Sequence, residues 1–388
     1  MRINAGPLMA IAICLVLVLG AEFALAWLAP MPDPYVAQRR VPGYVPSAHA
    51  PDQLYRIVIE PGLPGIEPVH PNRINEFSTN NLGLRGDDLV RPKPDDEWRI
   101  FTVGGSTMEC IILDDSRDLS RVLQETLDDP DSGRRTRVYN AGKSGDRSYD
   151  HLAMTAHRLA HLEPDVIVVF AGTNDLFAGL FATDYLHLEP RQLTNRDLLK
   201  YLAGESQLYR RLYAAARRFR RRTAREIQET IEFETNTAQK AELQRSFAPI
   251  DRPPRVDLDA YATNLKSIIA VARAAGARTV LMTQATTWNS TIDPDAAAWH
   301  WMRLRQGGTY NERVMDAALE SYNDVMRELA ISENVELVDL ARLLPKSLEF
   351  FYDDMHFNDA GARVTAEALA AQLVTKAPKV PKYLPESQ

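Results

Sequence analysis

From about residue 100 onward, short apolar runs alternate with longer amphipathic stretches. Runs rich in β-branched and aromatic residues predict strands at 100–103, 137–139, 166–171, 279–283 and 335–338. Apolar positions at helical spacing predict helices near 119–127, 149–162, 258–275, 313–331 and 360–373. The run Val166-Ile-Val-Val-Phe-Ala171 has no polar member, which is typical of a strand covered on both faces. This alternation predicts a doubly wound α/β fold with a five-stranded, mostly parallel sheet.

The amino-terminal segment has a different pattern, because residues 7–29 are apolar except for Glu22. Their length suits a membrane-spanning helix better than the short core of a signal peptide. We therefore predict an anchor within residues 1–29, with the rest of the chain on the extracytoplasmic (periplasmic or extracellular) side. Ala24-Leu-Ala26 also fits a cleavage site, and cleavage there would release a secreted protein.

Three further segments interrupt the alternation. Residues 30–75 contain ten prolines and predict an extended spacer that packs on the body, with one strand at 54–59. Residues 177–257 favour helix and hold no convincing strand, so we expect a helical insertion in a domain spanning 76–374. The tail, 375–388, is expected to be loose.

The insertion carries a dense arginine face within residues 209–225, opposite a stripe of apolar residues. One interpretation is a solvated face whose charge is compensated by the glutamates that follow it. The other is a helix that lies on anionic lipid, which would be a second membrane contact.

Composition narrows the classes of function. With 388 residues, of which 45% are apolar, the chain can bury a full-sized core. Its net charge of −7 argues against general binding to nucleic acid. The two cysteines, Cys14 and Cys110, lie in unlike settings and predict neither a disulfide nor a zinc site. His157 and His161 lie one helical turn apart, but no carboxylate completes a usual ligand set, so we expect no metal and no cofactor.

Candidate chemistry gathers in four blocks at the predicted carboxyl edge of the sheet, where ligands bind in open α/β folds. They are Gly104-Gly-Ser106, Asn140-Ala-Gly-Lys-Ser-Gly-Asp146, Gly172-Thr-Asn-Asp175 and Asp353-Asp-Met-His356. A serine placed after two glycines either caps the next helix or acts as a nucleophile.

Together the blocks supply the parts that acyl transfer needs. His356 can take the proton of Ser106, and Asp353, three residues earlier, can orient the imidazole. The backbone N–H groups of Ser106 and Gly145 and the side-chain amide of Asn174 are candidate oxyanion donors. Asp354 competes with Asp353 for the role of the acid.

These blocks resemble those of the SGNH (GDSL-type) serine hydrolases, whose serine, glycine, asparagine and histidine match Ser106, Gly145, Asn174 and His356. The Asp-x-x-His spacing of the family matches Asp353, and Asn80-x-x-Gly-Leu-Arg-Gly86 is similar to its exported, anchored branches. The resemblance implies a flavodoxin-like three-layer α/β/α sandwich and metal-free ester hydrolysis through an acyl-serine. The aspartate that usually precedes the serine is Gly105 here. An α/β-hydrolase elbow fits less well, because Met108 stands in the place of its second glycine.

The substrate is the least constrained part of the prediction. Trp288, Trp299 and Trp301 follow the fourth strand and could stack on sugar rings or pack their own loop. We expect a small acyl ester, such as an acetyl ester, of an extracytoplasmic glycan. The alternatives are a lipase or thioesterase, an acyltransferase that passes the acyl group to a sugar, and a catalytically silent glycan-binding or assembly subunit of the same fold.

Overall fold

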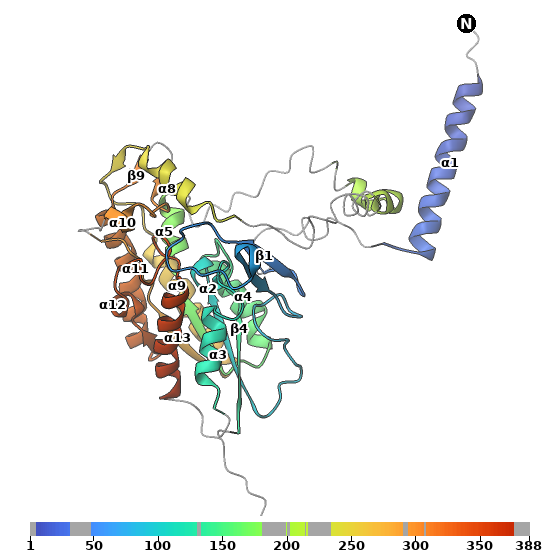
Figure 1. The fold of residues 1–388 in the computed structure, drawn as a ribbon. Helices are drawn as coiled ribbons and strands as arrows, with labels where there is room; N and C mark the ends of the chain where they lie inside the picture. The colour runs from blue at the N-terminus through green and yellow to red at the C-terminus, as the bar shows by residue number, and fades with distance from the viewer. Residues whose placement is uncertain are drawn as a thin grey trace, which may run out of the picture. The chain divides into compact units, whose positions relative to one another are not determined.

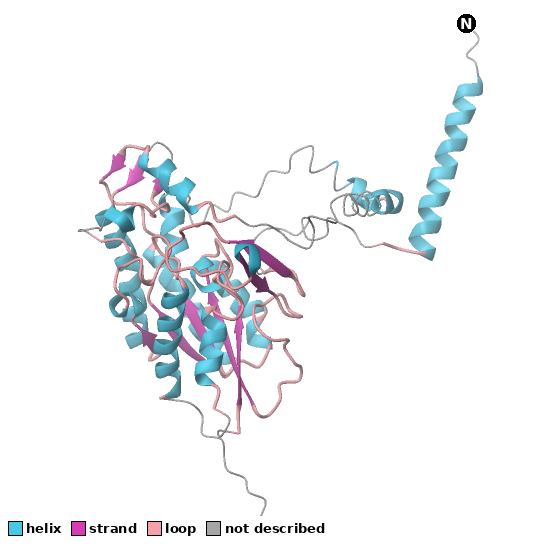
Figure 2. Cartoon of the chain, viewed as in Figure 1, coloured by secondary structure: helices cyan, strands magenta, loops and turns pink. Residues whose placement is uncertain are grey.

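A computed structural model describes residues 5–31, 48–129, 133–180, 199, 202–213, 215, 234–289, 294–305 and 308–375 (Figure 1, Figure 2). The chain divides into two compact units. One consists of Met1–Val45 and Glu189–Thr230, and the other of Pro46–Leu188 and Ile231–Gln388. All four sequence blocks lie in the second, larger unit.

The larger unit is built on five parallel strands in the order β10-β7-β5-β3-β4. Their bounds are β3 Glu97–Gly104, β4 Arg135–Asn140, β5 Val166–Phe170, β7 Arg278–Met282 and β10 Glu336–Val338. Numbered by their succession in the chain, these strands have the order 2-1-3-4-5 of flavodoxin-like sheets. In that order the connections leave in opposite directions from β3 and β5, which opens a crevice between their carboxyl ends.

Helices cover both faces of this sheet (Figure 1). On one face α3 (Leu119–Leu127) contacts α13 (Asp359–Val374), and on the other α9 (Leu258–Ala274) contacts both α4 (Ser148–His157) and α11 (Glu312–Ser332). The five-stranded parallel sheet and its helical layers confirm the predicted α/β class. The helix expected at 149–162 ends early, because Arg158 leaves the helical region (φ −137°, ψ −65°) and a short 3₁₀ turn, η3 (Leu159–His161), follows.

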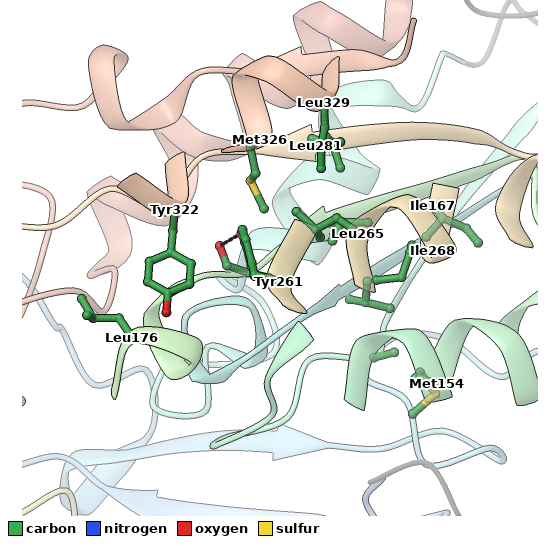
Figure 3. Packing of buried hydrophobic residues seen from close by; sticks show 14 of the residues in the cluster. Met154, Ile167, Leu176, Tyr261, Leu265, Ile268, Leu281, Tyr322, Met326 and Leu329 are labelled. Carbon is green, nitrogen blue, oxygen red and sulfur yellow. Dashed lines mark hydrogen bonds between the residues drawn. The ribbon is translucent and has the colours of Figure 1, made fainter. Parts of the chain in front are cut away.

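The strands divide their side chains between two cores, as the two-residue period of a strand requires. Ile167 and Val169 of β5 face the core beneath α9 and α11, whereas Val166, Val168 and Phe170 face the core beneath α3 and α13. Figure 3 shows the first core, with side chains of α9 and α11 packed over the sheet. Burial on both sides explains why β5 contains no polar residue.

Smaller elements surround the sheet. An antiparallel pair, β1 (Leu54–Val58) and β2 (Ile74–Ser78), confirms the strand predicted at 54–59. Residues 48–75, predicted as an extended spacer, include β1, the 3₁₀ turn η1 (Pro71–Arg73) and the first two residues of β2, and they bury Ile57 and Ile59 in the core beneath α3 and α13. The remaining short elements are α2 Ser106–Glu109, α5 Thr173–Leu180, α8 Thr237–Arg245, α10 Pro294–Ala297, α12 Leu340–Leu343, β6 Pro249–Ile250, β8 Leu304–Arg305 and β9 Gly308–Tyr310.

The expectation that 177–257 holds no strand is wrong at one point. β6, within this segment, pairs with β9, and β9 pairs with β8, in a small three-stranded sheet. A two-residue strand that begins with proline is too short to show alternation in the sequence, which is why the pattern missed it.

The smaller unit contains helix α1 (Ala5–Leu28) and a helical stretch at 207–213. Glu22, the charge within the apolar segment, accepts hydrogen bonds from Ser206 Oγ (3.0 Å) and from the backbone N–H groups of Gln207 and Leu208. Within the described ranges no helix is both long and apolar enough to cross a membrane, so the anchor at 7–29 stays a prediction. Most of the arginine stretch (214 and 216–225) and the tail from 376 lie outside the described residues.

Candidate active site

Ser106 begins α2, with one residue between it and the end of β3. Two glycines make this position accessible. A Cβ atom on Gly104 would lie 2.7 Å from the carbonyl oxygen of Phe170 on the neighbouring strand, and one on Gly105 would lie 2.3 Å from Nδ2 of Asn174. The missing side chains therefore let β3 approach β5 closely and let the Asn174 amide reach the turn that carries the serine.

A chain of hydrogen bonds joins three of the predicted residues. Nε2 of His356 lies 2.7 Å from Oγ of Ser106, and Nδ1 of the same ring lies 2.7 Å from Oδ2 of Asp353. The other carboxylate oxygen of Asp353 accepts from the backbone N–H groups of Met355 (2.9 Å) and His356 (2.8 Å), which tightens the loop before α13. These distances allow a proton to pass from the serine hydroxyl to the imidazole while the carboxylate holds the ring in place.

Two aromatic rings lie nearly parallel to the imidazole of His356. Trp301 lies nearly parallel to His356, with ring centroids 6.1 Å apart and planes 9° apart, and Tyr352 stacks at 5.4 Å and 11°. The indole Nε1 of Trp301 also donates to Asp353 Oδ2 at 2.8 Å. Trp301 therefore contacts both the imidazole and the carboxylate that orients it.

The electrostatics of this pair favour the ionised acid and the charged ring. Burial alone would lower the pKa of His356, but the charge of Asp353 and its hydrogen bond outweigh burial, so the pKa of His356 is raised above 6.5. Burial opposes ionisation of Asp353 as well, yet the facing imidazole and the backbone donors lower the pKa of its carboxyl below 3.8. Asp353 is thus suited to stabilise an imidazolium.

The predicted oxyanion donors line one cleft with the serine and the histidine. This Ser106 cleft has a volume of about 530 Å³, and its walls include Ser106, Gly145, Asn174 and His356. Gly145 has a φ of +85°, a conformation that favours glycine. Nδ2 of Asn174 donates to the carbonyl oxygen of Asp146 at 2.8 Å, which holds the amide at the mouth of the loop containing Gly145.

Glu109, which none of the four sequence blocks includes, supports that loop. It is only 1% exposed, and its Oε2 accepts from both the backbone N–H (2.9 Å) and the hydroxyl of Ser144. Its Oε1 lies 2.5 Å from Nε2 of His49, at the start of the segment predicted as a spacer. The sequence does contain a signal for Glu109, because it is an acidic residue three positions after the candidate nucleophile. A carboxylate that is buried so close to the site must have a partner.

The second acid candidate, Asp354, does not contact His356 through a hydrogen bond among the described residues. Its Oδ2 accepts from the Trp288 indole (3.3 Å) and from the backbone N–H of Met302 (2.9 Å). Burial, together with the neighbouring charge of Asp353, raises the pKa of Asp354 to about 6. The geometry therefore favours Asp353 as the orienting acid.

The three tryptophans proposed to bind sugar differ in placement. Trp288 is 1% exposed and its indole donates to Asp354, so its ring packs inside the protein, as the second of the two alternatives has it, and is not available for stacking on a substrate. Trp299 is partly buried against the core of α3 and α13 and is not among the residues that line the Ser106 cleft. Only Trp301 lines the cleft, and its edge is already used by Asp353.

The insertion contributes to the cleft wall. Thr235, Thr237 and Lys240, at and before α8, line the cleft, and the Lys240 ammonium lies 4.3 Å from the centroid of the Trp301 ring. Among the described residues there is no group of three histidine, cysteine, aspartate or glutamate side chains that could hold a metal ion.

Comparison with known proteins gives the family. The family described as GDSL-like Lipase/Acylhydrolase matches residues 102–364, a range that begins in β3 and ends in α13. No curated protein matches the chain.

Solved structures with a similar course of the chain include TesA (18% identity, 71% of this chain and 97% of that chain covered, TM-score 0.40). A second is Axe2, an acetylxylan esterase from Geobacillus stearothermophilus, with 14% identity, 73% of this chain and 96% of that chain covered, and a TM-score of 0.41. A third is LAE5, an alpha/beta hydrolase enzyme from the metagenome of Lake Arreo, Spain, with 17% identity, 72% of this chain and 95% of that chain covered, and a TM-score of 0.42.

The matched range covers four strands of the sheet completely and the carboxyl end of β3, and it includes Ser106, Asp353 and His356 at the Ser106 cleft. The protein is thus a serine ester hydrolase in class. It belongs to the GDSL-like lipase/acylhydrolase family.

Proposed function

We propose that the protein hydrolyses a small acyl ester, of acetyl type, on an extracytoplasmic carbohydrate through an acyl-serine intermediate. The observation that supports this proposal is the chain Ser106 Oγ–His356 Nε2 and His356 Nδ1–Asp353 Oδ2, with both distances at 2.7 Å, inside the Ser106 cleft. We assign the nucleophile to Ser106, the general base to His356 and the orienting acid to Asp353.

The reaction proceeds in two halves. Ser106 Oγ attacks the ester carbonyl while its proton passes to His356 Nε2, and the N–H groups of Ser106 and Gly145 and the Asn174 amide stabilise the oxyanion. The intermediate collapses, the C–O bond to the sugar breaks, and His356 returns the proton to the leaving alkoxide. A water molecule then gives a proton to His356 Nε2, and its oxygen attacks the acyl-serine carbonyl. The bond between the acyl carbon and Ser106 Oγ breaks, His356 returns the proton to Oγ, and the carboxylic acid leaves.

A carbohydrate alcohol is favoured by the groups around the serine. Thr237, Lys240 and Arg147 are among the residues that line the cleft. Their hydroxyl and cationic groups can bind a hydroxylated alcohol, whereas the apolar residues of the same lining, among them Ile111, Ile112 and Phe177, suit a small acyl group.

The direct test uses the full chain and p-nitrophenyl acetate, with Ser106→Ala as the control. We expect turnover by the wild-type protein and near-background rates for the variant, together with labelling of Ser106 by a fluorophosphonate probe. Equal rates for the two proteins would contradict the assignment. Asn174→Ala should raise the activation free energy by about 3 kcal/mol and lower kcat accordingly, because one oxyanion donor is lost.

The acyl and alcohol specificity needs its own measurement. Rates on p-nitrophenyl esters of increasing chain length, and on acetylated and deacetylated oligosaccharides, separate an acetyl esterase from a lipase or thioesterase. Product analysis with an added acceptor sugar separates hydrolysis from acyl transfer. Preference for long acyl chains would overturn the carbohydrate part of the proposal and leave the serine chemistry intact.

We also propose that residues 7–29 anchor the protein to a membrane, with the catalytic unit on the extracytoplasmic side. Apolar side chains of α1 are exposed, among them Leu17 (66%), Phe23 (76%) and Trp27 (78%), and Glu22 is satisfied by bonds within its own unit. Carbonate extraction followed by protease treatment of intact cells tests both halves. Recovery in the soluble fraction at full length would contradict the anchor.

The arginine stretch 209–225 is a second proposed membrane contact. Co-sedimentation of the full chain with phosphatidylserine vesicles, compared with neutral phosphatidylcholine vesicles, measures its contribution. If replacing Arg217, Arg218 and Arg220 by glutamine leaves the preference for anionic vesicles unchanged, the stretch is a solvated face instead.

A further inference from the structure

A second cavity lies beside α8, in the same unit as the Ser106 cleft. It has a volume of about 440 Å³, and its walls include Gln244, Arg245, Phe247, Arg303 and Glu312. No residue lines both this Gln244 cavity and the Ser106 cleft. The volume falls within the range of small-molecule sites in proteins.

Two residues that line the cavity also hold polar atoms that are buried from solvent and have no hydrogen-bond partner in the part of the chain that the structure describes. Gln244 is 2% exposed, and neither Oε1 nor Nε2 of its side chain has a hydrogen-bond partner among the described residues. Gln244 is the one described residue with two such atoms on its side chain. Nε of Arg303 is a third orphaned atom on the same wall.

Such atoms destabilise a fold unless something binds them, since buried polar groups in native proteins are almost always hydrogen-bonded. An apolar residue would fill the position of Gln244 at lower cost. Exchange of the two amide positions changes nothing, because both atoms are without a partner. No hydrogen bond with the described residues restrains the amide, so a turn of the side chain brings it to the cavity surface, where it can meet a group that both donates and accepts.

The surrounding charges determine what that group can be. Arg245 and Arg303 would repel a cation. Glu312 is paired with Nδ1 of His300 (2.8 Å) and with Arg303 (3.0 Å), and its carboxylate together with Oε1 of Gln244 disfavours an anion. A neutral ligand remains, and Phe247 and Pro249 offer it apolar contact beside the polar atoms.

We propose that the Gln244 cavity binds a neutral saccharide, separately from the reaction at Ser106. Sugar hydroxyls donate and accept at the same atom, so neighbouring hydroxyls satisfy both ends of the Gln244 amide, and the C–H face of the ring suits Phe247.

The helix α8 relates this site to the reaction. Lys240 on α8 lines the Ser106 cleft, and Gln244, four residues later, lines the Gln244 cavity. Four residues advance a helix by about 6 Å, so the two cavities lie on successive turns of one helix. A saccharide bound in the Gln244 cavity is thus held close to the site of ester hydrolysis.

The test measures sugar binding in the absence of turnover. A negative result would therefore contradict the Gln244 cavity proposal without bearing on ester hydrolysis at Ser106. Full-length Ser106→Ala protein, in a detergent without a sugar headgroup, is titrated calorimetrically with cellotetraose, chitotetraose and maltotetraose, and with inorganic phosphate and diglycine as competing chemistries. We expect binding of at least one oligosaccharide and none of phosphate or diglycine. Binding by none of the three sugars, or binding of phosphate or diglycine in their place, overturns the proposal.

A matched pair of substitutions locates the site. Gln244→Leu removes both orphaned atoms. We expect it to raise the Kd for the sugar about tenfold or more, because the hydrogen bonds between the sugar and the amide are lost. Gln239→Leu makes the same change at an exposed position of α8 and should leave Kd unchanged. Sugar affinity unchanged in Gln244→Leu would place the saccharide elsewhere and overturn the assignment. Rates of both variants, with Ser106 intact, on p-nitrophenyl acetate should equal that of the parent, which confirms folding.

Discussion

The indole Nε1 of Trp301 donates to Asp353 Oδ2 at 2.8 Å, the same oxygen that lies 2.7 Å from Nδ1 of His356. Trp301 thus acts on the imidazole twice, once through the ring stack and once through the carboxylate. Phenylalanine at this position would keep the stack and lose the donor.

Trp301→Phe should therefore lower kcat about tenfold with a smaller change in KM, because one hydrogen bond to a charged acceptor is removed. It should also move the acid limb of the pH–rate profile upward, since a carboxylate with one donor fewer stabilises the imidazolium more strongly. Trp299→Phe, at a position that does not line the Ser106 cleft, is the control. A structural role alone would change the melting temperature and leave the pH profile where it was.

The pH dependence of wild-type hydrolysis follows from the raised pKa of His356. The imidazole can accept the Ser106 proton only when neutral, so kcat/KM should rise with pH through a midpoint above 6.5. In Asp353→Asn, burial acts without the compensating charge, so NMR titration should find the pKa of His356 below 6.5. A wild-type midpoint below pH 6 would contradict the ion-pair description.

Asp354 makes stability depend on pH in the opposite sense to most carboxylates. Its folded-state pKa of about 6 exceeds the ordinary value of 3.8, so the folded protein binds more protons between these values and stability falls as pH rises through them. The pKa difference of roughly two units, at 1.36 kcal/mol per unit, lowers the free energy of unfolding by about 3 kcal/mol at pH 8 relative to low pH.

Asp354→Asn removes this titration. The variant should gain stability relative to wild type at pH 8, and the gain should shrink toward pH 4, as measured by chemical denaturation at both values. The exposed Asp95→Asn should show the same difference at both pH values. A gain for Asp354→Asn that is equal at pH 4 and pH 8 would show that the carboxylate is not held neutral by burial.

Gly105 makes restoration of the family's usual aspartate harmful here. A Cβ at this position would lie 2.3 Å from Nδ2 of Asn174, which must then move. Because the displaced atom ends a side chain, Gly105→Asp should cost little stability but lower kcat about 100-fold, the scale of losing one oxyanion donor. If Gly105→Asp and Asn174→Ala are combined, the two losses should not add, and full additivity would argue against displacement of the amide.

Glu109 should matter for rate through the loop that it holds. Glu109→Gln keeps the size of the side chain but replaces one of its two acceptor oxygens with a donor, next to Ser144 and His49. We expect kcat to fall about tenfold, as for loss of a charged hydrogen bond, with KM nearly unchanged. Glu97→Gln, also buried but at the opposite end of β3, is the matched control and should leave kcat unaffected.

The sequence was informative where a local pattern carries the signal. The five runs of β-branched residues became the five strands, and α3 has the predicted bounds of 119–127, because Asp118 caps it and accepts from the Ser120 N–H at 2.9 Å. The structure also brings Ser106, Asp353 and His356 together, as expected of loops that leave one edge of a parallel sheet.

What the sequence did not reveal depends on contacts between distant segments. Trp301 meets Asp353 across 52 positions, and His49 meets Glu109 across 60, and neither pairing leaves a periodic trace. The burial of Trp288 was hidden for the same reason, since a loop has no repeat that separates an inward ring from an outward one. The family motifs predicted the positions of Ser106, Asp353 and His356, but not the residues that hold the site in place through hydrogen bonds, such as Trp301 and Glu109.

The 250 positions between Ser106 and His356 have a consequence for the life of the chain. The loop that carries His356 directly precedes α13, which packs against α3. The imidazole of His356 therefore reaches the Ser106 hydroxyl only when α13 has docked. A nascent polypeptide that has emerged no further than residue 350 carries the hydroxyl and the amide but no base. Ester cleavage therefore requires that residues 353–356 have been synthesised and that α13 has docked on α3, so the onset of activity reports this docking step.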